Sequence, residues 1–190
     1  MVQSDFFEAS EEALTDEIAL EDIFQAYYDC RKNKRRTINA LAFELNFEQE
    51  LIRLWREINS GKYRIGRSIA FVVQKPVQRE VFAADFRDRI VHHLIINKLN
   101  PLFEEYFSDG SYSCRAGRGT LYGVRNIAAA VKECSAGYTR DCYILKLDIR
   151  SFFMSIDKNI LYQMLHAFIT EKYRQPDQRK IGRASCRERV

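Results

Sequence analysis

The residue with the clearest capacity for chemistry is Asp148, a carboxylate that directly follows an apolar run. That run, Tyr143–Leu147, has the composition of a buried β-strand, and two aromatic residues, Phe152 and Phe153, follow after a short turn. A carboxylate at the end of a strand can lie on a rigid support facing a groove, and the Mg²⁺ ions of phosphoryl transfer need such hard oxygen ligands. Alternatively, Asp148 caps the following helical turn.

Hydrophobic periodicity and turn residues predict the elements that must position this carboxylate. Helices are expected over residues 15–36, 39–58, 85–99, 121–134 and 157–173, with a new helical turn starting at Pro101. Strands are expected over residues 63–74, 80–83 and 143–147, with a turn at 75–79. The mixture indicates an α+β protein.

Composition places the chain among globular proteins. Of its 190 residues 46% are hydrophobic, and with 8 Gly and 3 Pro it is neither collagen-like nor disordered. No apolar run reaches the ~20 residues of a membrane span, and the first residues lack the basic-then-apolar order of a signal peptide. The five cysteines are scattered without CxxC spacing, which predicts neither a disulfide framework nor a zinc site. We therefore expect a reduced, cytoplasmic protein with no membrane partner.

Charge is distributed unevenly along the chain. The total of +4 combines net charges of −6 over residues 1–61, +4 over 62–118, +3 over 119–179 and +3 over 180–190. Such a shift marks a candidate domain boundary, and a basic body suits an acidic partner such as nucleic acid. A run of charges can equally be a solvated face.

The last residues, Lys180–Val190, follow a helical pattern abruptly and have no evident hydrophobic period. They are similar to the translation of a common sequencing-library adapter, with Lys180 at the junction. We therefore predict that residues 181–190 are a non-native tail and that the natural protein is longer. A natural basic tail is the alternative. The codons of the coding DNA distinguish the two.

Four blocks of the sequence, taken in order, resemble the bacterial reverse transcriptases of group II introns, retrons and diversity-generating retroelements. The blocks are Phe71–Leu94, Ser111–Thr120, Leu145–Phe153 and Phe153–Asp157. They are similar to the fingers hairpin with its following helix, the next block, the first palm motif and the continuation of that motif. Together they cover about residues 62–168, and the first two are most similar to the diversity-generating type.

The resemblance implies a two-metal phosphoryl transfer in which Asp148 is the catalytic Mg²⁺ ligand. The backbone carbonyl of Ile149 would make a second metal contact. Phe153, five residues after Asp148, would be the steric gate that favours dNTP over rNTP. Phe153 could instead be an ordinary core residue.

The same resemblance implies that the cations of two loops bind phosphate groups. Lys75 and Arg79 would hold the incoming triphosphate, which suits two permanent cations, one of them with a planar fork of donors. Arg115 and Arg118 would contact the nucleic-acid backbone, or the template near the incoming base. In the alternative interpretation, Lys75 and Arg79 are solvated turn residues and Arg115 pairs with an acidic residue.

Other polar residues are expected to have structural roles. Asp157 precedes a helical pattern and is expected to be its N-cap. His92 and His93 are adjacent on a helix, so they point about 100° apart and are not expected to bind a metal together. Three cysteines are expected to be small buried apolar residues, namely Cys114, Cys134 and Cys142.

The fold that the resemblance implies is α+β, the fingers and the start of the palm of a right-hand polymerase, truncated. Residues 1–61 would form an acidic helical N-terminal extension, residues 62–140 the fingers and residues 141–180 the start of the palm. The parent protein would be an RNA-directed DNA polymerase that uses Mg²⁺, an RNA template, a DNA primer and dNTPs. A cognate structured RNA is a further expected partner.

The second palm motif of the family, Tyr-x-Asp-Asp, is absent from this sequence. One carboxylate and one carbonyl cannot hold two Mg²⁺ ions, so we expect the chain alone not to polymerise DNA. Two alternatives stay open for the parent. One is an RNA-binding, splicing-assistance module of the maturase kind, and the other is a defence-type reverse-transcriptase relative with altered or template-free synthesis.

Overall fold

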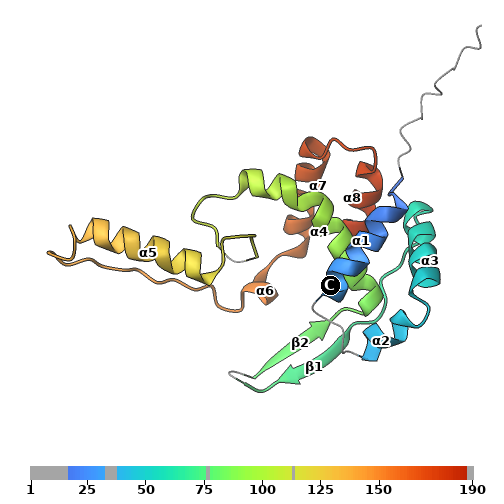
Figure 1. The fold of residues 1–190 in the computed structure, drawn as a ribbon, viewed down its shortest axis with the longest axis horizontal. Helices are drawn as coiled ribbons and strands as arrows, with labels where there is room; N and C mark the ends of the chain where they lie inside the picture. The colour runs from blue at the N-terminus through green and yellow to red at the C-terminus, as the bar shows by residue number, and fades with distance from the viewer. Residues whose placement is uncertain (1–16, 33–37, 76–77, 113, 188–190) are drawn as a thin grey trace, which may run out of the picture. The chain divides into compact units, whose positions relative to one another are not determined.

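A computed structural model describes residues 17–32, 38–75, 78–112 and 114–187 (Figure 1). Its elements are, in chain order, α1 (Leu20–Arg31), α2 (Ile38–Glu44), α3 (Phe47–Asn59), β1 (Ile69–Val73), β2 (Arg79–Ala83), α4 (Phe86–Tyr106), α5 (Thr120–Cys134), α6 (Phe152–Ser155), α7 (Lys158–Lys172) and α8 (Gln178–Arg187). The described chain is rich in helix and has a small antiparallel sheet of β1 and β2, which confirms the α+β class.

The chain divides into two compact units. The first comprises residues 1–102 together with 158–190, and the second comprises residues 103–157. The division falls within α4, whose last turn belongs to the second unit. In the described part of the chain, every helix is too short or too polar to cross a membrane.

In the first unit, α1 packs on α3 through apolar faces at helical spacing. The buried residues of the two helices are Ile23, Ala26, Tyr27, Cys30, Leu51, Leu54 and Ile58. Ile18, before α1, is tied to α3 by three hydrogen bonds. Its amide donates to Asn59 Oδ1 (2.9 Å), and its carbonyl accepts from Trp55 Nε1 (2.7 Å) and Asn59 Nδ2 (3.1 Å). Burial of these faces is what stabilises the helices.

The helix predicted over residues 39–58 is two helices in the structure. Asn46 leaves the helical conformation (φ −136°, ψ 35°) and occupies the N-cap of α3. Glu48 and Glu50 then lie in the first turn, where their charges favour the positive end of the helix dipole. The helix predicted over residues 15–36 is described only as α1, because residues 15–16 and 33–36 lie outside the described residues.

An aromatic cluster joins the acidic N-terminal region to α4. The ring of Phe86, the first residue of α4, makes edge contacts with Tyr27 and Phe43, with centroids 6.3 Å and 5.4 Å apart. Tyr27 also stacks on Phe47 at 5.2 Å. The described part of residues 1–61 therefore shares one core with α4.

The predicted hairpin is present. β1 and β2 pair antiparallel, with Ile69 opposite Ala83 and Val73 opposite Arg79. The first strand is shorter than the predicted 63–74, because β2 offers only five partners. Residues 63–68 therefore form no strand hydrogen bonds with β2, and within this segment Tyr63 and Gly66 bind to α4 instead.

α4 follows the hairpin directly and contributes much of the core. Its buried apolar residues are Phe86, Ile90, Val91, Leu94, Ile95 and Leu99. We predicted a new turn at Pro101, but α4 runs through that residue without a break. A proline removes one helical hydrogen bond, and here Pro101 is exposed.

In the second unit, the prediction of a buried strand at Tyr143–Leu147 is wrong. The segment is irregular, and its apolar side chains are open to solvent, with Tyr143 at 92% exposure and Leu145 and Leu147 at 81%. A strand needs a neighbour for its backbone amides and carbonyls. Among the described residues of this unit there is no strand to provide one.

The prediction of buried cysteines is wrong as well. Cys114 and Cys134 are exposed, and Cys142 is half-buried. Cys134 ends α5, and the chain then reverses through a turn that returns Cys142 alongside it. A hydrogen bond that the Cys142 thiol makes to Cys134, with a smaller effect of burial, raises the pKa of Cys142. Such a thiol is a poorer nucleophile at neutral pH than a free cysteine.

The C-terminal helices return to the first unit. α7 begins at Lys158, directly after Asp157, the residue predicted to be its N-cap. α8 includes most of the predicted non-native tail and buries Ile181 and Ala184, three residues apart. The segment thus has a short apolar face that we did not predict. Its origin in an adapter stays a prediction that the coding DNA tests.

A polar cluster ties α1, α4 and the α7–α8 connection together. Lys98 Nζ pairs with Asp22 (2.6 Å) and Asp177 (3.2 Å), and the Tyr173 hydroxyl donates to Asp177 (2.7 Å). Burial acts to lower the pKa of Lys98, but the two carboxylates outweigh it and raise the pKa. Burial and the Asp177 charge also raise the pKa of Tyr173.

Candidate nucleotide and nucleic-acid site

The hairpin places two cations at the two ends of one turn. Arg79 is the first residue of β2 and lies opposite Val73, and Lys75 follows Val73 by two residues. Lys75 is exposed and forms no ion pair with any residue that the structure describes. Antiparallel pairing therefore holds both positions at the tip of a two-stranded support. This geometry suits an anion held at the tip, and it also fits solvated turn residues.

A buried carboxylate that we did not predict anchors the base of the hairpin. Asp88, on the first turn of α4, is 1% exposed. It accepts hydrogen bonds from the Tyr63 hydroxyl (3.0 Å) and from the Gly66 amide (2.8 Å). A Cβ at Gly66 would lie 3.1 Å from Asp88 Oδ2, so the backbone approaches closely here. Asp88 thus fixes the irregular segment that leads into β1.

Arg87 supports the same segment from the adjacent position on α4. Its guanidinium lies over the Tyr63 ring (5.3 Å to the centroid), donates to the Arg64 carbonyl (3.4 Å) and pairs with Glu57 of α3.

The hydrophobic pattern of α4 offered a signal for the burial of Asp88 that the sequence analysis missed. Asp88 shares its helical face with Val91 and Ile95, at i+3 and i+7, and a carboxylate on an apolar face indicates a buried partner.

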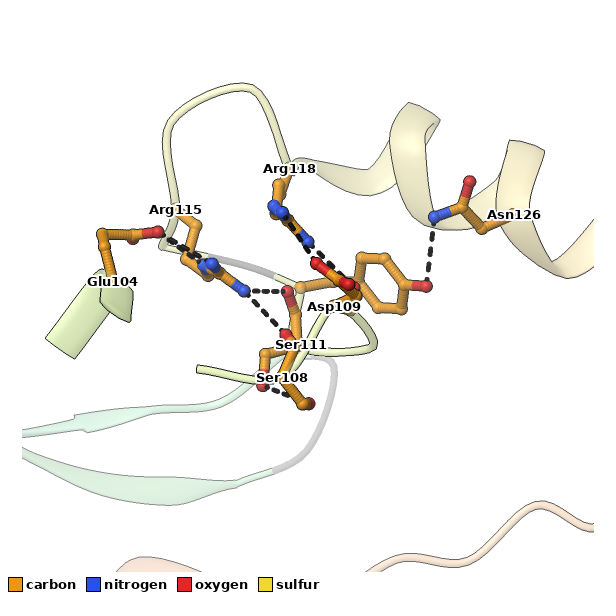
Figure 2. A network of polar contacts seen from close by, with 8 residues as sticks. Glu104, Ser108, Asp109, Ser111, Arg115, Arg118 and Asn126 are labelled. Carbon is orange, nitrogen blue, oxygen red and sulfur yellow. Dashed lines mark hydrogen bonds and ion pairs between the residues drawn. The ribbon is translucent and has the colours of Figure 1, made fainter. Parts of the chain in front are cut away.

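Arg115 closes the loop between α4 and α5 (Figure 2). Its Nε and Nη2 contact Glu104 Oε2 at 2.9 Å and 2.8 Å, and its Nη1 donates to the carbonyls of Ser108 (2.9 Å) and Ser111 (3.1 Å). The guanidinium also lies 5.1 Å from the Phe107 ring centroid, and the side chain is 6% exposed. Pairing with an acidic residue, the alternative left open above, is what the structure shows. A contact with nucleic acid stays a prediction for this residue.

Arg118 is more accessible than Arg115. It donates to the Asp109 carbonyl (3.0 Å) and pairs with the Asp109 carboxylate (3.1 Å), which is 98% exposed (Figure 2). Its guanidinium lies 5.6 Å from the Tyr122 ring centroid. An exposed ion pair of this kind contributes little stability. Arg118 can therefore exchange Asp109 for a phosphate at low cost.

Asp148, Ile149 and Phe153 lie on the irregular segment before and within α6. Asp148 is exposed, and its Oδ1 accepts a hydrogen bond from the Ile149 amide (2.9 Å). It does not cap α6, whose N-cap is Ser151 in a left-handed conformation (φ 53°). Phe153 is 83% exposed and makes an edge contact with Phe152 (5.3 Å), so the prediction of an ordinary core residue is wrong.

The residues at Asp148 do not form a complete metal site. They supply one carboxylate and, at Ile149, one backbone carbonyl. Among the described residues, no group of three His, Cys, Asp or Glu side chains could hold a metal ion. A pair of Mg²⁺ ions needs more oxygen ligands than these two residues offer.

The predicted site residues are divided between the two units. Lys75 and Arg79 belong to the first unit, whereas the second unit contains Arg115, Arg118, Asp148, Ile149 and Phe153. Within the second unit, one loop brings Arg115 and Arg118 together.

Comparison with known proteins finds a distant relative. No protein-family model matches the chain. The chain is similar to Protein YkfC of Escherichia coli (strain K12), with 24% identity over 136 residues, which are 70% of this chain. The matched region is 35% of YkfC, so the chain spans about a third of the length of that curated relative.

Proposed function

We propose that this chain is the fingers and the start of the palm of a bacterial RNA-directed DNA polymerase. The parent protein copies an RNA template into DNA from dNTPs, with Asp148 as one ligand of the metal pair. The observation that carries this proposal is the order of the four blocks, together with the hairpin on which the first one lies. Lys75 and Arg79 lie at the two ends of its turn, and α4 follows at once.

The chemistry of the loops supports the same assignment. A triphosphate carries several negative charges, and Lys75 is an exposed cation without a partner among the described residues. The charge of Arg118 is paired with one exposed carboxylate, that of Asp109, and its guanidinium lies next to the aromatic ring of Tyr122. A cation beside an aromatic ring suits a phosphate and its neighbouring base.

A second candidate function, RNA binding without synthesis, rests on a different observation. The described residues offer one carboxylate at the proposed metal site and no metal-binding group of three. A protein that kept this fold to hold structured RNA, as a splicing-assistance module, would not need the rest of the site. A defence-type relative with altered or template-free synthesis would still need it. Whether the gene encodes the remaining metal ligands beyond this chain separates the two functions.

The test is the natural gene. DNA that covers and follows the codons of residues 170–190 is recovered from the source and sequenced. A downstream Tyr-x-Asp-Asp in frame is the expected result, and an intact gene without it favours the binding role.

The 190-residue chain itself is expected to give no Mg²⁺-dependent dNTP incorporation in a primer-extension assay. Incorporation by the purified chain would overturn the view that its metal site is incomplete.

A further inference from the structure

A strip of three cations lies along the segment that joins α3 to β1. Lys62, Arg64 and Arg67 are exposed. None of the three side chains forms an ion pair with a residue in the described part of the chain. The segment contains no acidic residue. We call these three residues the basic strip.

The basic strip is held in place although its backbone belongs to no helix or strand. Between its cations, Tyr63 is 2% exposed and its hydroxyl donates to Asp88, and the Gly66 amide donates to the same carboxylate. The Arg64 carbonyl accepts from Arg87. The backbone of the strip is thus fixed to α4 through Tyr63, Arg64 and Gly66, while the three cationic side chains are exposed to solvent. Pre-organised charges lose less conformational entropy when they bind a ligand.

The acidic residues around the basic strip are already engaged. Glu57 pairs with Arg53 and Arg87, and Asp88 accepts from Tyr63 and Gly66. Asp85 accepts from the Arg87 amide at the start of α4. The net positive charge of the strip is therefore available to an external anion.

The dimensions of the strip fit a polyanion better than a single phosphate. Five residue steps separate Lys62 from Arg67, which span at most about 16 Å at roughly 3.3 Å per residue. One nucleic-acid strand carries a phosphate about every 3.4 Å along a helix axis. A row of three cations within this span can meet more than one phosphate of a strand.

We propose that the basic strip, Lys62, Arg64 and Arg67, is a binding site for the phosphate backbone of single-stranded RNA, set by the Asp88 anchor. The identity of the partner as RNA rests on the proposed function. The strip leads directly into β1, so a strand bound there is delivered to the base of the hairpin that bears Lys75 and Arg79. It would contribute to affinity and register and would not read base sequence.

The experiment measures binding of the 190-residue chain to a fluorescein-labelled 15-nucleotide uridine RNA by anisotropy, between 0.05 and 0.3 M KCl. The strip variant is K62Q/R64Q/R67Q. The matched control, K132Q/R174Q/R179Q, removes the same charge from exposed positions on α5, after α7 and in α8. Circular dichroism melts establish that both variants are folded.

For single-stranded nucleic acid, each phosphate contact contributes about 0.7 to the slope of log Kd against log salt. The strip variant should therefore lose a slope of about 2, and its Kd should rise on the order of 100-fold at 0.1 M KCl. The control should change the slope by less than about half as much. A strip variant that behaves like the control overturns the basic strip and leaves the proposed function standing. Failure of the wild-type chain to bind the RNA would also overturn the basic strip as a binding site. The polymerase assignment would then still be decided by the sequence of the downstream gene.

Discussion

At the scale of single residues, Asp88 is the polar group on which the most local structure depends. It is buried, and its two oxygens accept from a side chain and from a backbone amide on the segment that leads into β1. Sequence reasoning found the apolar face of α4 but not the carboxylate within it. The partners of Asp88 lie 25 and 22 residues away, and no local periodicity reveals them.

Replacing Asp88 by alanine should lower the free energy of unfolding of the chain by about 3 kcal/mol, because two buried donors lose their acceptor. Urea unfolding followed by circular dichroism measures this loss. Asp109→Ala is the matched control, since Asp109 is 98% exposed, and it should cost less than about 1 kcal/mol. Equal losses in the two variants would contradict the anchoring role of Asp88.

Arg115 and Arg118 are close in sequence but should respond differently to mutation. Arg115→Ala removes bonds to Glu104 and two carbonyls in a nearly buried setting and should cost about 2 kcal/mol, whereas Arg118→Ala should cost less than about 1 kcal/mol. Hydrogen exchange of the amides of residues 103–112 and 114–119 measures both. About thirtyfold faster exchange is expected for Arg115→Ala alone. A larger effect for Arg118→Ala would refute this assignment.

At the scale of elements, the sequence predicts best what depends on neighbours in the chain. The hairpin, the start of α4 and both ends of α5 were expected close to where the structure has them, because turn residues and periodicity are local signals. The start of β1 and the end of α4 were not, because they depend on the partner strand and on packing. The strand at Tyr143–Leu147 was expected from composition alone and is absent. β-propensity describes how well a residue fits a sheet, and a sheet needs a second strand, which the described residues of this unit do not provide.

The segment Tyr143–Leu147 should therefore exchange its amide hydrogens almost freely in the 190-residue chain. β1 and β2 should be measurably protected, because their amides are paired. Mass spectrometry of peptides from the two regions makes the comparison within one sample. In the parent protein, by contrast, we expect the same segment to be protected by neighbouring palm strands. Protection of Tyr143–Leu147 in the isolated chain would show that it has a partner there.

At the scale of the whole molecule, the charge boundary near residue 61 is not a boundary of packing. Tyr27 and Phe43 of the acidic region meet Phe86 of α4 in one aromatic cluster. Segment charges could not predict this, because the cluster is built from residues about 40 to 60 positions apart along the chain. The positive charge that we propose for binding nucleic acid is local, in the hairpin turn, the basic strip and the α4–α5 loop.

The stability of the first unit should depend on pH through His93 of α4. Burial lowers the pKa of His93, and the charges of His92 and Lys32 act in the same direction, while Asp29 opposes them. The unfolded chain therefore binds the proton more readily, with a pKa near 6.5. The free energy of unfolding should fall as the pH drops below about 6.5 and should be fully retained above it.

Urea unfolding at pH 8.0, 6.5 and 5.5 measures this dependence, and His93→Gln should show a smaller decrease between pH 8.0 and 5.5 than the wild-type chain. An identical decrease in the two proteins would exclude His93 as its source.

The central claim is that Asp148 belongs to the metal site of an RNA-directed DNA polymerase. The most direct measurement is Mg²⁺-dependent primer extension on an RNA template by the parent protein, expressed from the natural gene, compared with its Asp148→Ala and Asp157→Ala variants. We predict synthesis by the parent and by Asp157→Ala. Asp148→Ala should lose about a thousandfold in rate, equivalent to about 4 kcal/mol, while it still binds RNA. Unchanged synthesis by Asp148→Ala, or no synthesis by the parent, would contradict the claim.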